Sequence, residues 1–298
     1  MSALLLGVIT GLLSSAINAI ATVGYQSQIE GSSTFIVNCI KTWAALPVML
    51  GAVVIFGSAS VFSVPLHAQV SLILSMLIGA TIADTFYLAG QKRIGVSYAL
   101  PIVAMFPIFT YILAIILLGD SPIVSRFLGI AIAVIGVMFL SKEQANVSYE
   151  KTGFRTVDKT GLLLALIASI LLAGGILLIQ VGVEGVDPIT AATIRLGSGS
   201  AIMVPFGFLA KAKGYQIPSS RSTKIIIISG ALGMGVAAIF WVVAIKYAGA
   251  VLVSVLGTTS PLFAIPISVV ILKESITRRG LTFIVVIVIG VATVILGA

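Results

Sequence analysis

Three charged residues stand inside long apolar stretches of the sequence: Lys41, Asp84 and Arg195. A charge at the centre of a bilayer costs about 2.5–3.5 kcal/mol on insertion scales, so such side chains are expected to pair or to face a cavity. Asp84 could take up a coupling proton or bind a substrate ammonium group. A fixed pair with Lys41, or a bond to a neighbouring hydroxyl, is its simpler role. If Asp84 and Lys41 converge, they match the two charges of an amino acid zwitterion.

The two cations could bind a metabolite carboxylate or phosphate. Side chains lean toward the N-terminus of their helix, and the helices that carry Lys41 and Arg195 are expected to run in opposite directions. The two cations would then reach toward opposite membrane faces. A substrate could meet one cation when the site is open to one face, and the other cation when it is open to the opposite face. The simpler alternative is that each reaches the nearer interface. Each could also pair with a nearby acid: Glu30 for Lys41, and Glu184 or Asp187 for Arg195.

Five further residues complete a candidate substrate site: Asn18, Asn38, Tyr87, Trp241 and Thr258. Asn38 lies three residues before Lys41, and so on the same helical face. Tyr87 stands in the same relation after Asp84. Asn18 is a lone amide in an apolar stretch, where an unpaired polar group is costly, so it should bond across helices or line water. We expect a polar and aromatic central cavity, although ordinary packing is the simpler role for each aromatic.

Four prolines within apolar stretches predict bent helices: Pro101, Pro107, Pro261 and Pro266. Proline removes a helix hydrogen bond and clashes with the preceding turn. Thr258, Thr259 and Ser260 could satisfy the freed carbonyls or present hydroxyls to a substrate. The bends either shape the cavity and give a gate its flexible point, or are static.

Enzyme chemistry finds little support in the sequence. His67 is the one histidine and Cys39 the one cysteine, so neither a metal site nor a Cys/His pair is indicated. No phosphate-binding G-x-x-x-x-G-K-[ST] loop is present, so ATP is not the direct energy source. We therefore expect no enzyme activity, no metal and no cofactor, and transport that draws on a gradient.

The composition places the chain in a bilayer, because 59% of its residues are hydrophobic and only 9% are charged. Apolar runs of about 20 residues, long enough to cross a hydrocarbon core, recur from end to end. The length and uniformity of the runs favour helices over a membrane barrel. The predicted fold is an all-α membrane protein with ten transmembrane helices: 2–23, 33–56, 68–90, 97–118, 123–141, 160–182, 188–210, 225–247, 249–272 and 279–297.

The sequence repeats itself at an offset of 154 residues, the separation of Pro107 and Pro261. The same offset pairs Lys41 with Arg195, Tyr87 with Trp241, Gly79 with Gly233, Lys92 with Lys246, Gly95 with Gly249, Asp120 with Glu274 and Gly136 with Gly290. An odd number of spans per copy makes the second copy inverted, as in many secondary carriers. We predict a first five-helix repeat over 1–141, a linker loop over 142–159 and an inverted repeat over 160–298. Because the repeats bury their faces against each other, a monomer could be complete.

The net charge of +8 indicates membrane topology and contact with anionic lipid, and no nucleic acid partner. Thirteen basic residues fall in loops opposite the termini: Lys92, Arg93, Lys142, Lys151, Arg155, Lys159, Lys211, Lys213, Arg221, Lys224, Lys273, Arg278 and Arg279. Only Arg126 and Lys246 lie on the side of the termini. Since cytoplasmic loops keep basic residues, the count predicts termini outside the cytoplasm, in a multi-pass plasma (inner) membrane protein.

Residues 87–137 and 241–291 resemble the EamA-type repeat of the drug/metabolite transporter superfamily. Four features of that repeat are present in the second copy. Lys246 and Tyr247 stand in the turn after an aromatic-rich helix, and Pro261 and Phe263 in the next helix. Lys273 and Glu274 match the following turn, and Gly280 and Gly290 the glycine pattern of the last helix. The first copy matches less well, with Asp120 in place of the glutamate and no serine before Pro107. The resemblance covers nearly the whole chain and implies a ten-helix exporter. It also implies termini in the cytoplasm, opposite to the charge count. Small four-helix relatives carry a glutamate in their first helix, which this chain lacks.

These observations predict a secondary active transporter that exports small metabolites, most plausibly amino acids, by alternating access. A facilitative or exchange carrier for anionic metabolites, with Lys41 and Arg195 as its anion contacts, is the alternative. A membrane sensor or intramembrane enzyme would need a signalling domain or a catalytic pair, and the sequence indicates neither. The expected partners are a small-molecule substrate and membrane lipid.

Overall fold

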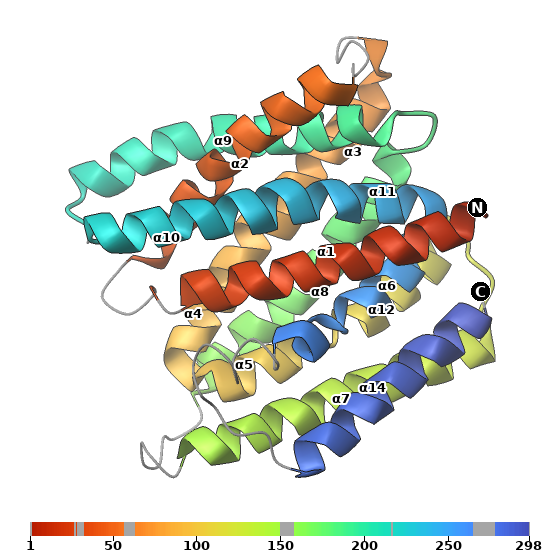
Figure 1. Cartoon of the computed structure of the whole chain (residues 1–298). Coiled ribbons are helices and arrows are strands. Elements are labelled where there is room, and N and C mark those ends of the chain that lie inside the picture. The colour runs from red at the N-terminus through yellow and green to blue at the C-terminus, as the bar shows by residue number, and fades with distance from the viewer. Residues whose placement is uncertain are drawn as a thin grey trace.

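The protein is an arrangement of long helices, described here from a computed structural model that covers residues 2–26, 28, 33–56, 63–149, 158–215, 217–264 and 278–297. These residues form α- and π-helices and no strand. Long apolar sequences in which every backbone group must find an internal partner leave helix as the natural choice. The helices run between two ends of the molecule, and both termini lie at the same end (Figure 1). We call this the terminal end.

The first repeat begins with α1 (Ala3–Gln26) and α2 (Thr34–Phe56). One continuous helix follows, made of α3 (Leu66–Ser75), the π-helix η2 (Met76–Ile82) and α4 (Ala83–Ile94). The next span is broken into α5 (Val96–Val103) and α6 (Phe106–Leu113), which continues as η3 (Ala114–Leu118). The helix α7 (Val124–Tyr149) completes the repeat.

The second repeat follows the same order. It contains α8 (Lys159–Gly182), α9 (Pro188–Ala212), then α10 (Ser220–Gly230), η4 (Ala231–Ala237) and α11 (Ala238–Ala248), then α12 (Ala250–Gly257) and finally α14 (Arg278–Leu296). Nine helices of the described residues are long and apolar enough to cross a membrane. The tenth predicted span, 249–272, is described as far as Ala264, as a shorter apolar helix over Ala250–Ala264.

Equivalent positions in the two repeats have equivalent backbone. Gly95 ends α4 with φ 80° and ψ 161°, and its mate Gly249 ends α11 with φ 80° and ψ 158°. Positive φ strains residues with a Cβ, so glycine suits both turns. The α5–α6 helix is interrupted at residues 104–105, just before Pro107, and the matching helix at 258–259, just before Pro261. Proline without an N–H fits the first turn of each restarted helix.

The repeats are interlocked, because the first helix of each packs into the other. The α1 helix contacts α11 and η4, and α8 contacts α4 and η2. A Cβ built on Gly79 would lie 3.0 Å from Gly175 Cα, and one built on Gly233 would lie 2.9 Å from Ala21 Cβ. These two crossings are related by the 154-residue offset. Such close approach of backbones requires small residues, as is usual between membrane helices.

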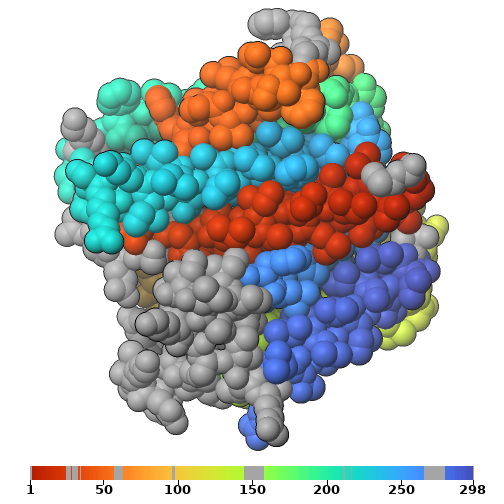
Figure 2. Space-filling view, viewed as in Figure 1, coloured from red at the N-terminus to blue at the C-terminus, as the bar shows by residue number. Residues whose placement is uncertain are grey.

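The α7 helix extends to Tyr149, beyond the boundary predicted at 141. Residues 150–157 of the predicted linker lie outside the described residues, so the division into 1–141, 142–159 and 160–298 stays a prediction. The outer helix faces are apolar, with Leu50 62% and Val54 82% exposed. In Figure 2, α1 and the α10–α11 helix lie side by side on one such face, and α14 appears on the same face beyond α12. Exposed apolar side chains along whole helices suit contact with lipid tails.

Candidate functional site

The structure pairs Lys41 with Asp84. Lys41 lies in α2 and Asp84 in the first turn of α4, and Lys41 Nζ is 3.3 Å from Asp84 Oδ2. The Lys41 side chain is 6% exposed and that of Asp84 is 27% exposed. Lys41 sits where α10 approaches closely, since a Cβ on Gly230 would meet Lys41 Cα at 2.7 Å. The pair therefore joins two helices of the first repeat next to a helix of the second.

Asn38, one turn before Lys41 in α2, is 1% exposed. Neither its Oδ1 nor its Nδ2 has a hydrogen-bond partner among the described residues. A buried amide without partners costs roughly 1–3 kcal/mol on mutational scales. A buried donor group and a buried acceptor are thus unsatisfied on the helical face that carries Lys41.

An apolar pocket of about 280 Å³ lies between α2, η2, α4 and α9. Its walls are Phe35, Leu77, Thr81, Ile82, Thr85, Phe86, Met203 and Phe206. Thr85 follows Asp84 directly in the chain, and its hydroxyl donates to Thr81 O at 2.7 Å. The walls therefore offer apolar contact near the charged pair, without including the pair itself.

Arg195, the repeat mate of Lys41, lies in α9 and is 8% exposed. Its Nε donates to Ser75 Oγ at 2.8 Å, and Ser75 is the last residue of α3 before the π-helix. Asp187, one of the acids considered as its partner, instead accepts hydrogen bonds from Thr190 N and Thr190 Oγ1 at the start of α9. No ion pair of Arg195 is found within the described residues.

The remaining predicted residues are dispersed. Asn18 is exposed, and its Oδ1 faces Gly233 of η4. Tyr87 packs against the small apolar cluster that includes Ala99 and Ala165. Trp241 packs against Gly257, where an added Cβ would lie 3.0 Å from the indole ring.

The hydroxyl groups beside the helix break at residues 258–259 form hydrogen bonds with their own helix. Thr258 Oγ1 donates to Val255 O at 2.7 Å and Thr259 Oγ1 to Leu256 O at 2.6 Å. The two hydroxyls thus satisfy carbonyls at the end of α12 rather than pointing at a ligand. Pro101 lies inside α5, and Pro107 in the first turn of α6. Pro266 and Glu30 lie outside the described residues, as do Lys273 and Glu274.

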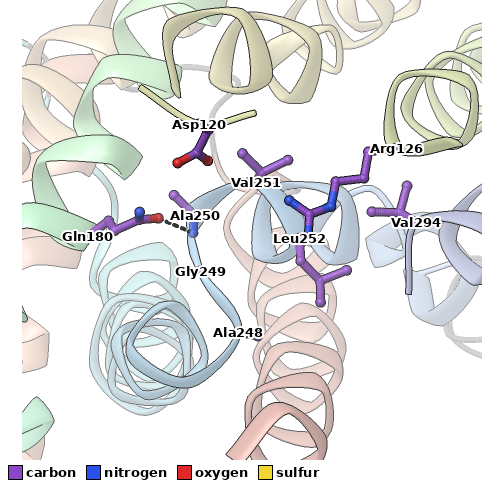
Figure 3. Close-up of a pocket in the computed structure, with 9 residues that line it drawn as sticks. All are labelled: Asp120, Arg126, Gln180, Ala248, Gly249, Ala250, Val251, Leu252 and Val294. Carbon is purple, nitrogen blue, oxygen red and sulfur yellow. Dashed lines mark hydrogen bonds between the residues drawn. The ribbon is translucent and has the colours of Figure 1, made fainter. Parts of the chain in front are cut away.

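A second pocket, of about 80 Å³, lies at the terminal end (Figure 3). Asp120 and Gln180 point into it from one side, and Arg126 reaches over Leu252 from the other. Gln180 Oε1 accepts a hydrogen bond of 2.6 Å from Ala250 N, the first residue of α12. Arg126 Nε donates to Gly297 O, and Lys246 Nζ to Val186 O. These bonds hold the terminal-end loops together.

Sequence reasoning missed Gln180 and Ser75. The first N–H groups of any helix lack partners, so the turn at Gly249 could have indicated that α12 needs a cap. Nothing in the sequence pointed to Ser75, because serine within an apolar helix commonly bonds its own backbone. Ser75 does donate to Leu72 O at 2.6 Å, while its oxygen also accepts from Arg195.

Apolar helices in two inverted repeats, with charged side chains between them, define a helical membrane protein. The model of the EamA-like transporter family matches residues 5–142 and 159–296, one match to each repeat. The chain therefore belongs to the EamA-like transporter family, whose members are membrane transporters of small molecules.

Solved structures agree with this fold. One, described only as "Crystal structure of protein", is 19% identical, with a TM-score of 0.77 over 98% of this chain and 94% of that one. At this identity the likeness shows the fold alone. No curated protein matches the chain.

Proposed function

We propose that this protein is a secondary active transporter that exports amino acids by alternating access, with Lys41 and Asp84 as its recognition pair. The observation that carries the proposal is a pair of opposite charges 3.3 Å apart inside the apolar bundle, on a helix whose Asn38 amide has no partner among the described residues. Family membership supports transport of a small molecule.

A zwitterion would bind by replacing the ion pair. Its carboxylate accepts from Lys41 Nζ, and its ammonium group donates to Asp84 Oδ2. The exchange turns one ion pair into two, so every charge keeps a partner of opposite sign. A buried charge without such a partner is the arrangement that costs most in a low-dielectric site. The Asn38 amide adds one donor and one acceptor, and so fits both ends of the same substrate. A ligand with a single charge would match only one member of the Lys41–Asp84 pair.

The ion pair also suits the empty carrier. When no substrate is bound, Lys41 and Asp84 neutralise each other, so this pair adds no uncompensated charge when the bundle changes conformation. Asp84, whose charge the Lys41 ammonium group balances, is the candidate for coupling. The breaks before Pro107 and Pro261 lie in equivalent helices of both repeats, and we assign them as the bending points of alternating access.

The distribution of basic residues supports an orientation with the terminal end outside the cytoplasm, in the plasma membrane. The Lys41 and Asp84 pair would then be reached from the cytoplasm, because α2 begins at the end opposite the termini (Figure 1). Export starts from that side.

The test is uptake of labelled amino acids, one by one, into proteoliposomes with and without a pH gradient. The wild-type protein is compared with Asp84→Asn, Lys41→Ala and the control Lys224→Ala, since Lys224 is exposed at the start of α10. We expect gradient-dependent accumulation in wild type and control, and its loss in both site variants. If Asp84→Asn accumulates amino acids as wild type does, the recognition role is refuted.

A carrier for anionic metabolites is the second candidate, favoured by Arg195, which has no carboxylate partner within the described residues. In that case Lys41 and Arg195 are the anion contacts and transport is facilitative or by exchange. The same variant separates the two: Asp84→Asn abolishes uphill transport by a proton-coupled exporter, but leaves exchange intact in a facilitative carrier.

A further inference from the structure

Arg195 is a buried cation with most of its hydrogen-bonding capacity open. Its Nε is used by Ser75, and its two Nη nitrogens make no hydrogen bond or ion pair with the described part of the chain. A charge in a membrane interior that lacks a counterion is costly. Guanidinium groups bind planar carboxylates through two parallel N–H bonds, and Nε with one Nη, or both Nη, provide that fork.

The repeat relation shows what is missing at Arg195. The offset that pairs Lys41 with Arg195 pairs Asp84 with Ala238, the first residue of α11. The first repeat therefore supplies a cation with its acid, and the second supplies a cation alone. Other acids nearby are engaged or exposed: Asp187 caps α9, and Glu184 is exposed in the α8–α9 turn.

Arg195 and the Lys41 pair form separate sites. Ser75, which holds Arg195, and Asp84 lie nine residues apart on one continuous helix. Seven of the residues between them form the π-helix η2, so Arg195 and Lys41 contact this helix on different turns. Arg195 is seven residues into α9, which starts at the terminal end, whereas Lys41 is seven residues into α2, which starts at the opposite end.

We propose that Arg195 and Ser75 form a second substrate site, nearer the terminal end, which binds the carboxylate and lacks a partner for the ammonium group. This inference rests on the proposed function and extends it. A substrate that moves from Lys41 to Arg195 keeps a partner for its carboxylate and loses Asp84. Binding from the membrane face at the terminal end, called the terminal face below, is therefore weaker for a zwitterion and tolerates acids without an amino group.

The experiment uses two analogues of a transported amino acid: the 2-oxo acid, which keeps the carboxylate and lacks the ammonium group, and the amino amide, which does the reverse. Each is applied to one face of oriented proteoliposomes as an inhibitor. We expect the 2-oxo acid to inhibit at least tenfold more strongly from the terminal face than from the other. The amino amide should inhibit poorly from the terminal face.

Three variants assign the effect to Arg195. Arg195→Gln should remove inhibition by the 2-oxo acid at the terminal face, Arg195→Lys should weaken it about tenfold because the fork is lost, and Ser75→Ala should weaken it less. Equal inhibition from both faces, or inhibition that Arg195→Gln leaves unchanged, overturns the proposal.

Thermal stability provides an independent readout. Removing a cation that has no counterion breaks no ion pair, so Arg195→Gln should lower Tm no more than Ser75→Ala, which breaks the same hydrogen bond, and the 2-oxo acid should raise Tm only when Arg195 is present. A Tm for Arg195→Gln below that of Ser75→Ala would show a further structural partner and refute the site. If no amino acid is transported but the 2-oxo acid still raises Tm through Arg195, the proposed substrate fails and the second carboxylate site stands.

Discussion

Replacing Asp84 with Asn should destabilise the protein through Lys41 rather than through Asp84 itself. The substitution keeps the side-chain shape and leaves a lysine that is 6% exposed without its 3.3 Å partner. A lysine at the bilayer centre costs about 2.5–3.5 kcal/mol on insertion scales. Because the Asp84 side chain is 27% exposed, water screens part of the interaction, and we expect a loss of about 2 kcal/mol. This corresponds to a shift of about 30-fold in the unfolding equilibrium.

The assay is reversible unfolding in mixed detergent micelles for four proteins: wild type, Asp84→Asn, Lys41→Met and the double variant. The double variant removes both members of the ion pair, so it should regain most of the stability that Asp84→Asn loses. All three variants should fail to transport. If the free energy of unfolding of the double variant is below that of Asp84→Asn by the whole loss measured for Lys41→Met alone, the two side chains act independently. That result would refute the pairing on which the recognition model depends.

Three other substitutions test the packing and the caps. Gly175→Ala places a methyl carbon 2.5 Å from a backbone atom of the facing π-helix and should cost about 1–3 kcal/mol in the same assay, whereas the adjacent Gly174→Ala meets no atom within 4 Å and should be neutral; equal effects would contradict the crossing. Gln180→Ala removes the cap of α12 and should cost about 0.5–2 kcal/mol, with Gln180→Glu retaining the acceptor. Hydrogen bonds from Arg93 and the Thr160 backbone hold the pKa of Asp158 below its ordinary value, so this contact stabilises fully at neutral pH and is lost as the pH falls through the lowered pKa. Asp158→Asn should therefore flatten the acid limb of a pH-stability curve, and an unchanged limb would exclude this contact as its cause.

The sequence predicted the fold well because membrane helices are constrained locally. The lengths of the apolar runs, the offset of 154 residues and the two matched prolines each follow from the residues themselves. Family membership and the helical repeats confirm this part of the prediction. The π-helices η2 and η4 were not predicted, because an extra residue per turn over about two turns leaves no visible change in an apolar sequence.

The partners of the charged residues could not be chosen from the sequence. Lys41 had Glu30 and Asp84 as candidates, and Arg195 had Glu184 and Asp187. Which side chains meet depends on how each helix is rotated and where it crosses its neighbours. The pattern of apolar and polar residues in the sequence does not specify either. Ser75 is the clearest case, since it reaches Arg195 from a helix 120 residues away in the sequence.

The contrast between a symmetric backbone and asymmetric charges is the feature most relevant to the direction of the proposed transport. The glycine turns, helix breaks and helix crossings of one repeat recur in the other, so the two access states are expected to be close in energy. Under the proposed function substrate binding is not symmetric, because Asp84 has Ala238 as its mate. A carrier with equal affinity on both faces only equilibrates its substrate, and a difference in affinity cannot by itself drive accumulation. In the proposed mechanism, the weaker site near the terminal end sets where release is fast, and a gradient that acts through Asp84 supplies the driving force. Replacing Ala238 with Asp would therefore slow release at the terminal face without altering the final accumulation ratio, which single-turnover efflux can measure.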